Sequence, residues 1–168
     1  LKDIEAGHIE DIIDALDKPA GKVIGLPFGV NFTIEYDRYV LALASISLCS
    51  FPTLGGEAAL KIPGKTLFSD WAITAAVEKR PGSKKIKVSD DDFTVRLDLE
   101  KAGKALTVRS RRPGDRFQPL GMAQPKKLNI FMIDARIPQN WRRNIPVVCS
   151  GDDIVWVVGY RISERYKL

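Results

Sequence analysis

The sequence predicts an α+β protein that is rich in β-structure and built as two small domains. Most apolar residues alternate with polar ones, which is the pattern of half-buried strands, and helical spacing is confined to two short segments. Proline and glycine interrupt the strands at short intervals. A polar, turn-rich stretch at 79–87 marks the best internal boundary. We therefore expect the end of a helical linker over residues 1–20, a β-rich middle domain over 21–83 and a C-terminal domain over 84–168.

A short helix and a hairpin are predicted near the start of the chain. The apolar residues within 9–16 recur at i, i+3, i+4 and i+7, on one face of a helix, and Pro19 follows as a stop signal. Over residues 30–36 the period changes to two. Asp37-Arg38 then turns the chain into a second strand around 39–46, which predicts a β-hairpin.

Shorter strands are predicted further along. Residues 57–62 form one candidate, which Pro63-Gly64 ends, and residues 71–77 alternate again. The second half opens with strict alternation over 93–99, and Ala102-Gly103 turns the chain into a partner strand. We expect these two segments to pair.

The remainder of the chain is predicted as a shaped loop, a helix and a hairpin. Aperiodic glycines and prolines over 109–121 indicate the loop. A short amphipathic helix is predicted at 126–135, entered after Pro125. Two apolar β runs follow, joined by a hairpin turn at 150–153, and residues 160–166 are a final strand candidate.

The residue counts argue against several kinds of active site. The chain has one histidine, His8, and two cysteines, Cys49 and Cys149, whereas a zinc site needs about four closely spaced ligands. His8 is expected to be a surface or half-buried helix residue, and the cysteines to be small buried residues in a reducing compartment. No phosphate-binding loop ending in Gly-Lys-Ser/Thr is present. We expect no metal site and no catalytic residue in this chain.

Targeting signals are also not recognised in the sequence. The longest apolar stretch, 40–51, contains three serines and is too short to cross a bilayer. We therefore expect a cytoplasmic protein with no membrane partner. Because the chain begins with Leu1 rather than Met, we further expect a fragment of a longer protein.

The positive charge of the chain is concentrated in one segment. The net charge is +5, yet residues 109–143 hold nine basic and two acidic residues, a net of +7, so everything outside them sums to −2. Seven of the nine are arginines, whose planar guanidinium groups match phosphate oxygens in pairs. The pattern predicts a surface that binds phosphates of a polyanion.

Two lysines break a local rule at the start of the second predicted helix. Lys126 and Lys127 would place cations at a helix N-terminus, which is unfavourable by about 0.3–1 kcal/mol each. An anion docked on the free backbone N–H groups there would relieve the conflict. The alternative is that both lysines are simply solvated. Because many arginines flank them, we favour the anion site.

Four other residues are predicted to shape this segment. Asp115 and Asp134 are its two acids, and each is expected to orient an arginine or to satisfy loop N–H groups rather than to act in acid–base chemistry. Gly114 and Gly121 are expected to supply positive φ angles or close backbone approach. The aromatic residues nearby are expected to anchor packing, with stacking on an unpaired base as the alternative.

Several runs in the second half carry a more specific pattern. They are RSRRPGDRFQPLG at 109–121, Lys126-Lys127-Leu128, IDARIP at 133–138 and IVWVVG at 154–159. In these runs the chain resembles the C-terminal region of tRNA(isoleucine) lysidine synthetases, and earlier segments resemble the family's middle region. The last part also resembles a domain of the phenylalanyl-tRNA synthetase β chain. One departure is visible, because Met122-Ala123-Gln124-Pro125 stands where the family usually has a second glycine before the paired lysines.

The resemblance implies a fold and a role. The C-terminal domain would be a three-layer, partly open barrel or sandwich with one or two short helices, and it would bind isoleucine tRNA; the middle domain would bind substrate. The full enzyme would be a ligase that uses ATP, with Mg²⁺, to join lysine to the wobble cytidine, in an N-terminal domain that this chain lacks. This chain would hold no cofactor and would be inactive alone, and a homodimer is compatible with the resemblance. The residues predicted to bind tRNA are Arg109, Arg111, Arg112, Arg116, Lys126, Lys127, Arg136, Arg142 and Arg143.

Three alternatives use the same residues differently. The charged segment would also serve a non-catalytic module that binds an acidic protein partner. In a purely structural domain, the arginines would pair with acids of the first half. A stand-alone enzyme is disfavoured because no catalytic constellation is recognised.

Overall fold

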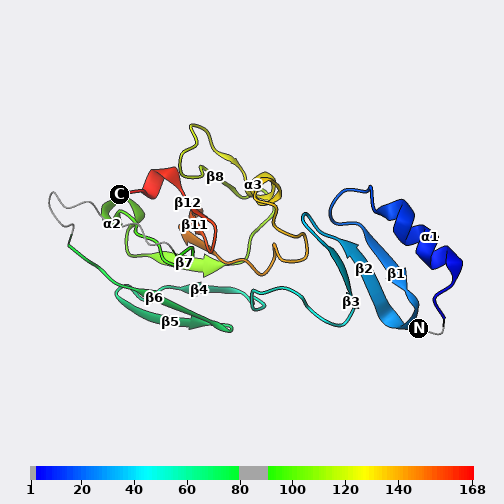
Figure 1. Cartoon of the computed structure of the whole chain (residues 1–168). Helices are drawn as coiled ribbons and strands as arrows, with labels where there is room; N and C mark the ends of the chain where they lie inside the picture. Colours follow the sequence, from blue (N-terminus) through cyan, green and yellow to red (C-terminus); the bar gives the residue numbers. More distant parts are fainter. Residues whose placement is uncertain (1–2, 80–90) are drawn as a thin grey trace.

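Small antiparallel sheets make up most of the fold, as expected for a β-rich α+β protein (Figure 1). A computed structural model describes residues 3–79 and 91–168. Within these residues, four sheets of two to five strands occur with three α-helices, and none of the sheets closes into a barrel. The predicted fold class is therefore confirmed. None of the helices in these two ranges is long and apolar enough to cross a membrane.

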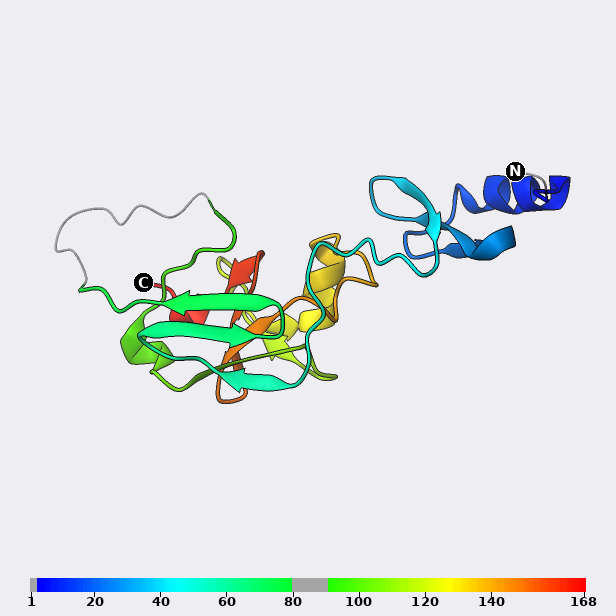
Figure 2. The same ribbon diagram turned by 90° about the horizontal axis from the view of Figure 1, so that it is seen from below.

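The N-terminal module, by which we mean helix α1 with strands β1–β3, lies at one end of the molecule (Figures 1 and 2). The sheet order is β1-β2-β3, and Ala15, Leu26, Phe32 and Ile34 form its core. The predicted helix and hairpin are confirmed here, since Ile34 pairs with Tyr39 across the turn. The elements are α1 (Ala6–Ala15), β1 (Val23–Leu26), β2 (Val30–Ile34) and β3 (Tyr39–Leu43).

A five-stranded sheet forms the centre of the remaining structure, with the order β12-β11-β10-β7-β4. Helix α3 (Leu128–Asp134) covers one face and helix α2 (Leu99–Ala102) packs on the other. Both faces of β10 and β11 are buried, and these two strands are almost continuously apolar. The strands are β4 (Glu57–Ala59), β7 (Leu106–Arg109), β10 (Val147–Ser150), β11 (Asp153–Val157) and β12 (Arg161–Ile162).

Two small hairpins complete the fold. Strands β5 (Gly64–Phe68) and β6 (Trp71–Ala75) pair with each other, and β8 (Arg116–Phe117) pairs with β9 (Lys126–Lys127). Phe51 stacks on Trp71 with ring centroids 5.8 Å apart, which ties the first hairpin to the centre of the molecule. The strand β6 was predicted from its alternation, whereas β5 was missed because its sequence has no clear period.

The predicted strand over 93–99 is wrong. Residues 91–98 have no strand structure, and Leu99 begins helix α2. The Asp98 carboxylate accepts hydrogen bonds from the N–H groups of the first helical turn, at 3.0 Å from Glu100 N. Such local side-chain acceptors compete with strand pairing. The two neighbours of β7 are instead β10 and β4.

The end of the chain is also less regular than predicted. Only Arg161–Ile162 of the 160–166 candidate is a strand, and a 3₁₀ turn at Glu164–Tyr166 follows. The hairpin turn at 150–153 is confirmed, because Ser150 pairs with Asp153.

The division into domains at 83/84 falls outside the described residues. One strand pairing nevertheless crosses this boundary. Strand β4 of the predicted middle domain pairs with β7 of the predicted C-terminal domain, with Ala58 opposite Val108. The segment 57–75 therefore lies beside the C-terminal sheet.

Candidate nucleic-acid interface

The basic segment 109–143 leaves the central sheet at β7 and returns to it at β10. Between these strands it forms the loop predicted at 109–121, the β8–β9 pair and helix α3 (Figure 1). Gly114 and Gly121 have φ angles of 86° and 85°. These are left-handed conformations that favour glycine, which confirms the predicted role of both residues.

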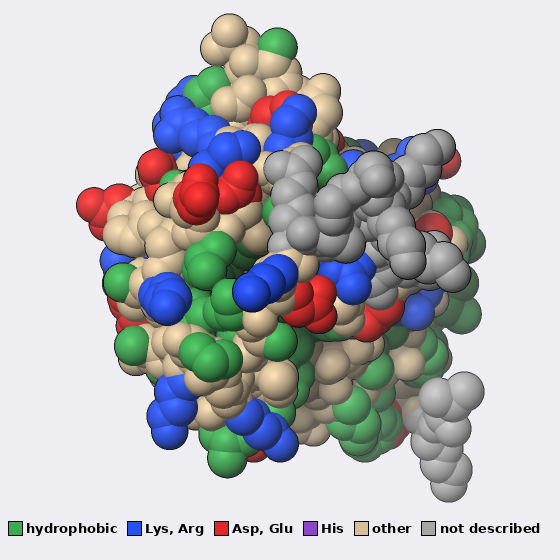
Figure 3. Space-filling view, turned by 90° about the vertical axis from the view of Figure 1, so that its left-hand side faces the viewer, with side chains coloured by type: hydrophobic (Ala, Val, Ile, Leu, Met, Phe, Trp, Pro, Cys, Tyr) green, Lys and Arg blue, Asp and Glu red, His purple; other side chains and the backbone are tan. Residues whose placement is uncertain are grey.

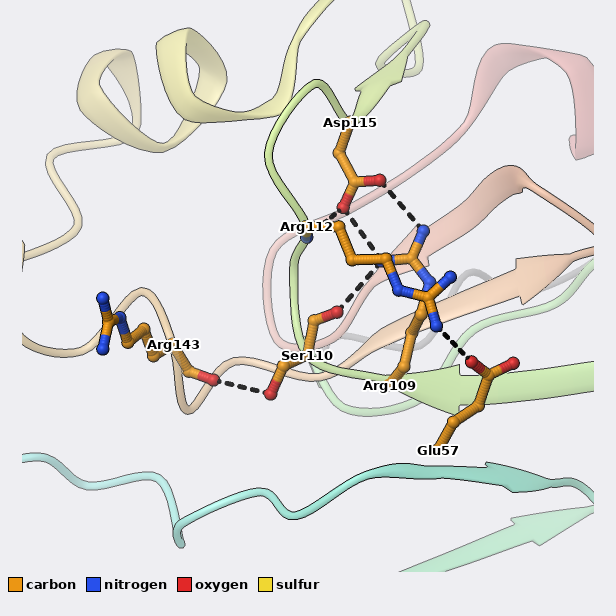
Figure 4. A network of polar contacts seen from close by, with 6 residues as sticks. All are labelled: Glu57, Arg109, Ser110, Arg112, Asp115 and Arg143. Carbon is orange, nitrogen blue, oxygen red and sulfur yellow. Dashed lines mark hydrogen bonds and ion pairs between the residues drawn. The ribbon is translucent and has the colours of Figure 1, made fainter.

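A buried ion pair organises the start of this loop (Figure 4). Arg109 donates two hydrogen bonds to the Asp115 carboxylate, with 2.9 Å between Nη1 and Oδ2 and 2.9 Å between Nη2 and Oδ1. The backbone N–H of Arg112 also donates to Asp115, at 2.6 Å. Only 4% of Arg109 is exposed. The prediction that Asp115 orients an arginine is confirmed, and the bidentate geometry makes this pair a structural element of the loop.

A second predicted tRNA-binding arginine is buried as well. Arg142 Nε donates to the carbonyl oxygen of Ile137 at 3.0 Å, and its Nη2 donates to the Tyr36 hydroxyl at 3.1 Å. This side chain joins the basic segment to the residues just after β2. Burial removes both Arg109 and Arg142 from the set of side chains that reach a large polyanion, because neither head group faces solvent.

The other predicted cations lie at or near the surface, and they differ in burial and in whether an acid pairs with them. Arg112 is paired with Glu57 at 2.5 Å and Lys126 with Asp134 at 2.6 Å, whereas Arg111 is half-buried. Asp134 thus orients a lysine rather than an arginine. Within the described residues, no salt bridge engages the exposed cations Arg116, Lys127, Arg136 and Arg143.

One end of the molecule carries side chains of both charges. On the end that carries α2 and the C-terminus, Lys and Arg side chains are interspersed with Asp and Glu (Figure 3). The charge of this end is therefore mixed. The four unpaired cations named above are the part of the predicted site that is most available to a ligand.

The structure moves the helix boundary at the predicted anion site. Lys126 and Lys127 form strand β9, and Lys127 is the N-cap residue of helix α3, so both lysines precede its first turn. The anion site itself stays a prediction. The N–H of Leu128, the first helical residue, donates to the carbonyl oxygen of Asp115 at 2.8 Å. The shaped loop thus satisfies one of the N–H groups at the helix start, an arrangement that helical periodicity alone does not reveal.

Arg136 occupies a strained backbone position at the end of α3. Its φ angle is 54°, and the N–H of Ile137 donates back to Met132 O at 2.9 Å, as in a helix-ending Schellman motif. Glycine is the usual residue at this position, because a side chain there costs about 1–2 kcal/mol. An exposed arginine here carries a cost in stability with no visible packing benefit.

Replacing Arg136 with glycine is therefore expected to raise stability. The free energy of unfolding should rise by about 0.5–1 kcal/mol, after the entropy cost of glycine is subtracted. Urea unfolding measures the change, and a glycine variant that unfolds more easily than the natural chain would contradict this account.

The aromatic residues of the segment act in packing, as expected. Phe117 is buried and meets Phe131 edge-to-face with ring centroids 5.0 Å apart. Trp141 packs against the core beside Phe51. The favoured packing interpretation is confirmed for both.

Two acids outside the segment were missed by the sequence analysis. Glu57 pairs with Arg112, and Glu164 accepts a hydrogen bond from the N–H of Gly121 at 2.8 Å, which lowers the pKa of the Glu164 carboxyl. Each lies more than 40 positions from its partner. No local signal in the sequence indicates such pairs.

Cys149 and the histidine take the structural places expected of them, whereas Cys49 is less buried than expected. Cys149 is buried in the core, and burial raises the pKa of its thiol to about 11, so it stays protonated near neutral pH. Cys49 is half-buried, and both thiols are free. His8 Nδ1 accepts a hydrogen bond from the backbone N–H of Glu5 at 3.0 Å, at the start of α1.

Comparisons with known proteins agree with this arrangement. Residues 106–168 match the family described as TilS substrate C-terminal domain. The chain is 42% identical to the tRNA(Ile)-lysidine synthase of Dehalococcoides mccartyi (strain CBDB1) over its whole length, and 37% identical over 98% of its length to that of Caldanaerobacter subterraneus subsp. tengcongensis. It covers 35% and 34% of these two proteins, so it spans about a third of their length.

A solved structure shows the same relationship. The crystal structure of a TILS C-terminal domain superimposes with a TM-score of 0.51 at 28% sequence identity, over 67% of this chain and 87% of that one. The superposition shows that the two structures share a fold over this region, and the match to the D. mccartyi protein extends over the whole chain. The chain therefore belongs to the tRNA(Ile)-lysidine synthase family and corresponds to the C-terminal region of these proteins.

Proposed function

We propose that this chain binds isoleucine tRNA through the exposed cations of the basic segment. The observation that carries the proposal is the group of four exposed cations, Arg116, Lys127, Arg136 and Arg143, that no acid neutralises within the described part of the chain. Arg111, Arg112 and Lys126 would add weaker contacts, because burial or an acidic partner engages each of them. Contacts of this kind reach phosphates, so they would position the RNA without reading its sequence.

The buried residues of the segment would serve the site indirectly. In this proposal Asp115, with Arg109, holds the loop in shape, Gly114 and Gly121 allow its turns, and Asp134 orients Lys126. A rigid loop reduces the entropy that must be lost when a charged ligand is bound. Phosphate-contacting side chains that stand on such a loop would therefore bind more tightly than those on a mobile one.

The activity of the whole protein follows as a further part of the proposal. A full-length synthase of this family would join lysine to the wobble cytidine of the tRNA with ATP, and this chain would hold the tRNA body while a separate N-terminal domain performs the ligation. The middle residues 21–83 would support substrate binding, and residues 84–168 would form the tRNA-binding domain. ATP, Mg²⁺ and lysine would bind outside this chain.

Salt dependence provides the direct test of the proposal. If four cations each neutralise about one phosphate, the logarithm of the tRNA-binding constant should fall against the logarithm of salt concentration with a slope near −3. Fluorescence anisotropy with labelled isoleucine tRNA at several salt concentrations would measure it. A slope near zero would refute binding through phosphates.

A competition experiment distinguishes tRNA from the acidic-protein alternative. A true tRNA site should bind isoleucine tRNA far better than an equal charge of heparin, an unrelated polyanion. A site for an acidic protein should bind the two polyanions alike. The relatives of this chain carry the name of tRNA(Ile)-lysidine synthases, and we therefore favour the tRNA.

A further inference from the structure

Exposed apolar side chains are concentrated in the first third of the chain. Among the described residues, ten of the seventeen exposed large apolar side chains lie between positions 9 and 48. Single exposed apolar residues are ordinary, but a contiguous group of them marks an interaction surface. The N-terminal module holds most of this group.

One row of exposed apolar residues runs along strand β3. Tyr39, Leu41 and Leu43 are 56%, 62% and 45% exposed. In the antiparallel register Leu41 lies opposite Phe32, so both side chains are on the same face of the sheet. Phe32 belongs to the module core with Ala15 of α1. The row on β3 therefore lies on the face that α1 covers, at the edge that α1 leaves open.

Helix α1 continues this surface. It packs beside β1, the strand furthest from β3 (Figure 1). Ile9 and Ile13 of the helix and Leu16, its C-cap residue, follow helical spacing and are 51%, 57% and 39% exposed. Leu16 lines a hollow of about 500 Å³ together with Ile34 and Tyr39, so the helix stripe turns toward the β3 side.

Little of the helix is buried. Only Ala15 of its ten residues is buried. A helix this short is marginal alone in water, and its stability in a protein comes from packing of its apolar face. The exposed stripe is thus a face whose packing partner is not part of the module.

The charge of the module argues against RNA as that partner. Helix α1 carries Glu10, Asp11 and Asp14 and no lysine or arginine, and Asp17 follows it. These acids would repel phosphates. The exposed apolar surface combined with acidic charge suits a polypeptide.

We propose that the apolar surface of α1 and β3 packs against the N-terminal two thirds of the synthase polypeptide, the part of the relatives that this chain does not cover. The chain corresponds to the C-terminal third of those proteins, so in the relatives about two thirds of the polypeptide precede the region that matches α1. Such a covalent link would give the two parts a local concentration of roughly millimolar. The surface thereby couples the module to the part of the protein that precedes it, independently of tRNA binding.

Hydrogen exchange tests this interface. The 168-residue chain would be compared with a chimera in which it replaces the matching C-terminal third of the D. mccartyi synthase. Amides of α1 and β3 should exchange at least tenfold more slowly in the chimera, and the double variant Ile13→Lys, Leu41→Lys should restore fast exchange. Leu67→Lys, at a 74% exposed position on β5, is the matched control and should change nothing.

Three results would overturn the proposal. The first is equal exchange of α1 and β3 in the chimera and in the isolated chain, and the second is equal protection in the double variant. The third is protection that appears in the isolated chain as its concentration rises, which would assign the surface to a second copy. Should the chimera misfold, the intact D. mccartyi synthase and its own C-terminal third would provide the same comparison. Isoleucine tRNA binding by the double variant is measured separately and should be unchanged, so failure of this interface is distinct from failure of the proposed function.

Discussion

Replacing Asp115 with alanine is expected to destabilise the protein by about 3–5 kcal/mol, because the change leaves a buried guanidinium without its counter-charge. Arg109 is 4% exposed and both of its terminal nitrogens bind this carboxylate. The N–H of Arg112 would lose its acceptor as well. Urea unfolding monitored by circular dichroism measures the change.

A matched pair of controls identifies the cause. Asp134→Ala removes the same residue type from an ion pair of 2.6 Å, but the Asp134 side chain is 55% exposed, and the expected cost is below about 1 kcal/mol. The double variant Arg109→Leu, Asp115→Ala removes both charges and should recover much of the lost stability. A cost for Asp115→Ala no greater than that for Asp134→Ala would contradict the structural role of the buried pair.

Removing the four unpaired cations together is expected to produce the largest loss of tRNA affinity. The variant Arg116→Ala, Lys127→Ala, Arg136→Ala, Arg143→Ala should bind isoleucine tRNA about 100- to 1,000-fold more weakly at moderate salt, if each contact contributes about 1 kcal/mol. The slope of affinity against salt should become shallower by about 3. Anisotropy titrations provide both quantities, with circular dichroism to confirm folding.

The control for this variant removes the same charge elsewhere. Lys18, Lys22, Lys65 and Lys104 are exposed and lie outside the basic segment, and their replacement by alanine lowers the net charge by the same amount. We expect less than a fivefold change in affinity for this control. Equal losses in the two variants would mean that tRNA responds to net charge and that the basic segment is not its site.

Local patterns in the sequence predicted the elements that depend on near neighbours. The helix before Pro19, the hairpin at Asp37-Arg38 and the turn at 150–153 form as expected, because periodicity and turn residues act over a few positions. The strand predicted from the alternation over 93–99 does not form, because a local pattern carries no information about distant pairing partners. A capping bond at Asp98 and the existing partners of β7 outweighed a local preference for strand.

In the candidate site, too, some features follow from local sequence and others depend on distant segments. Composition alone located the basic segment, and the runs within it indicated the family. Composition did not show which cations are available, because burial of Arg109 and Arg142 depends on strands and loops that are distant in the sequence. The same holds for Glu57 and Glu164, which reach the segment from outside it.

The residues alone show where the positive charge lies, which short elements form and which family the chain resembles. The folded chain shows that two of the nine cations hold the fold together, two pair with acids, one is half-buried and four have no salt bridge at the surface. Charge is a property of each residue, whereas exposure and pairing depend on which distant segments fold against it. A guanidinium that binds phosphate in water and one that binds a buried carboxylate are the same side chain in different surroundings.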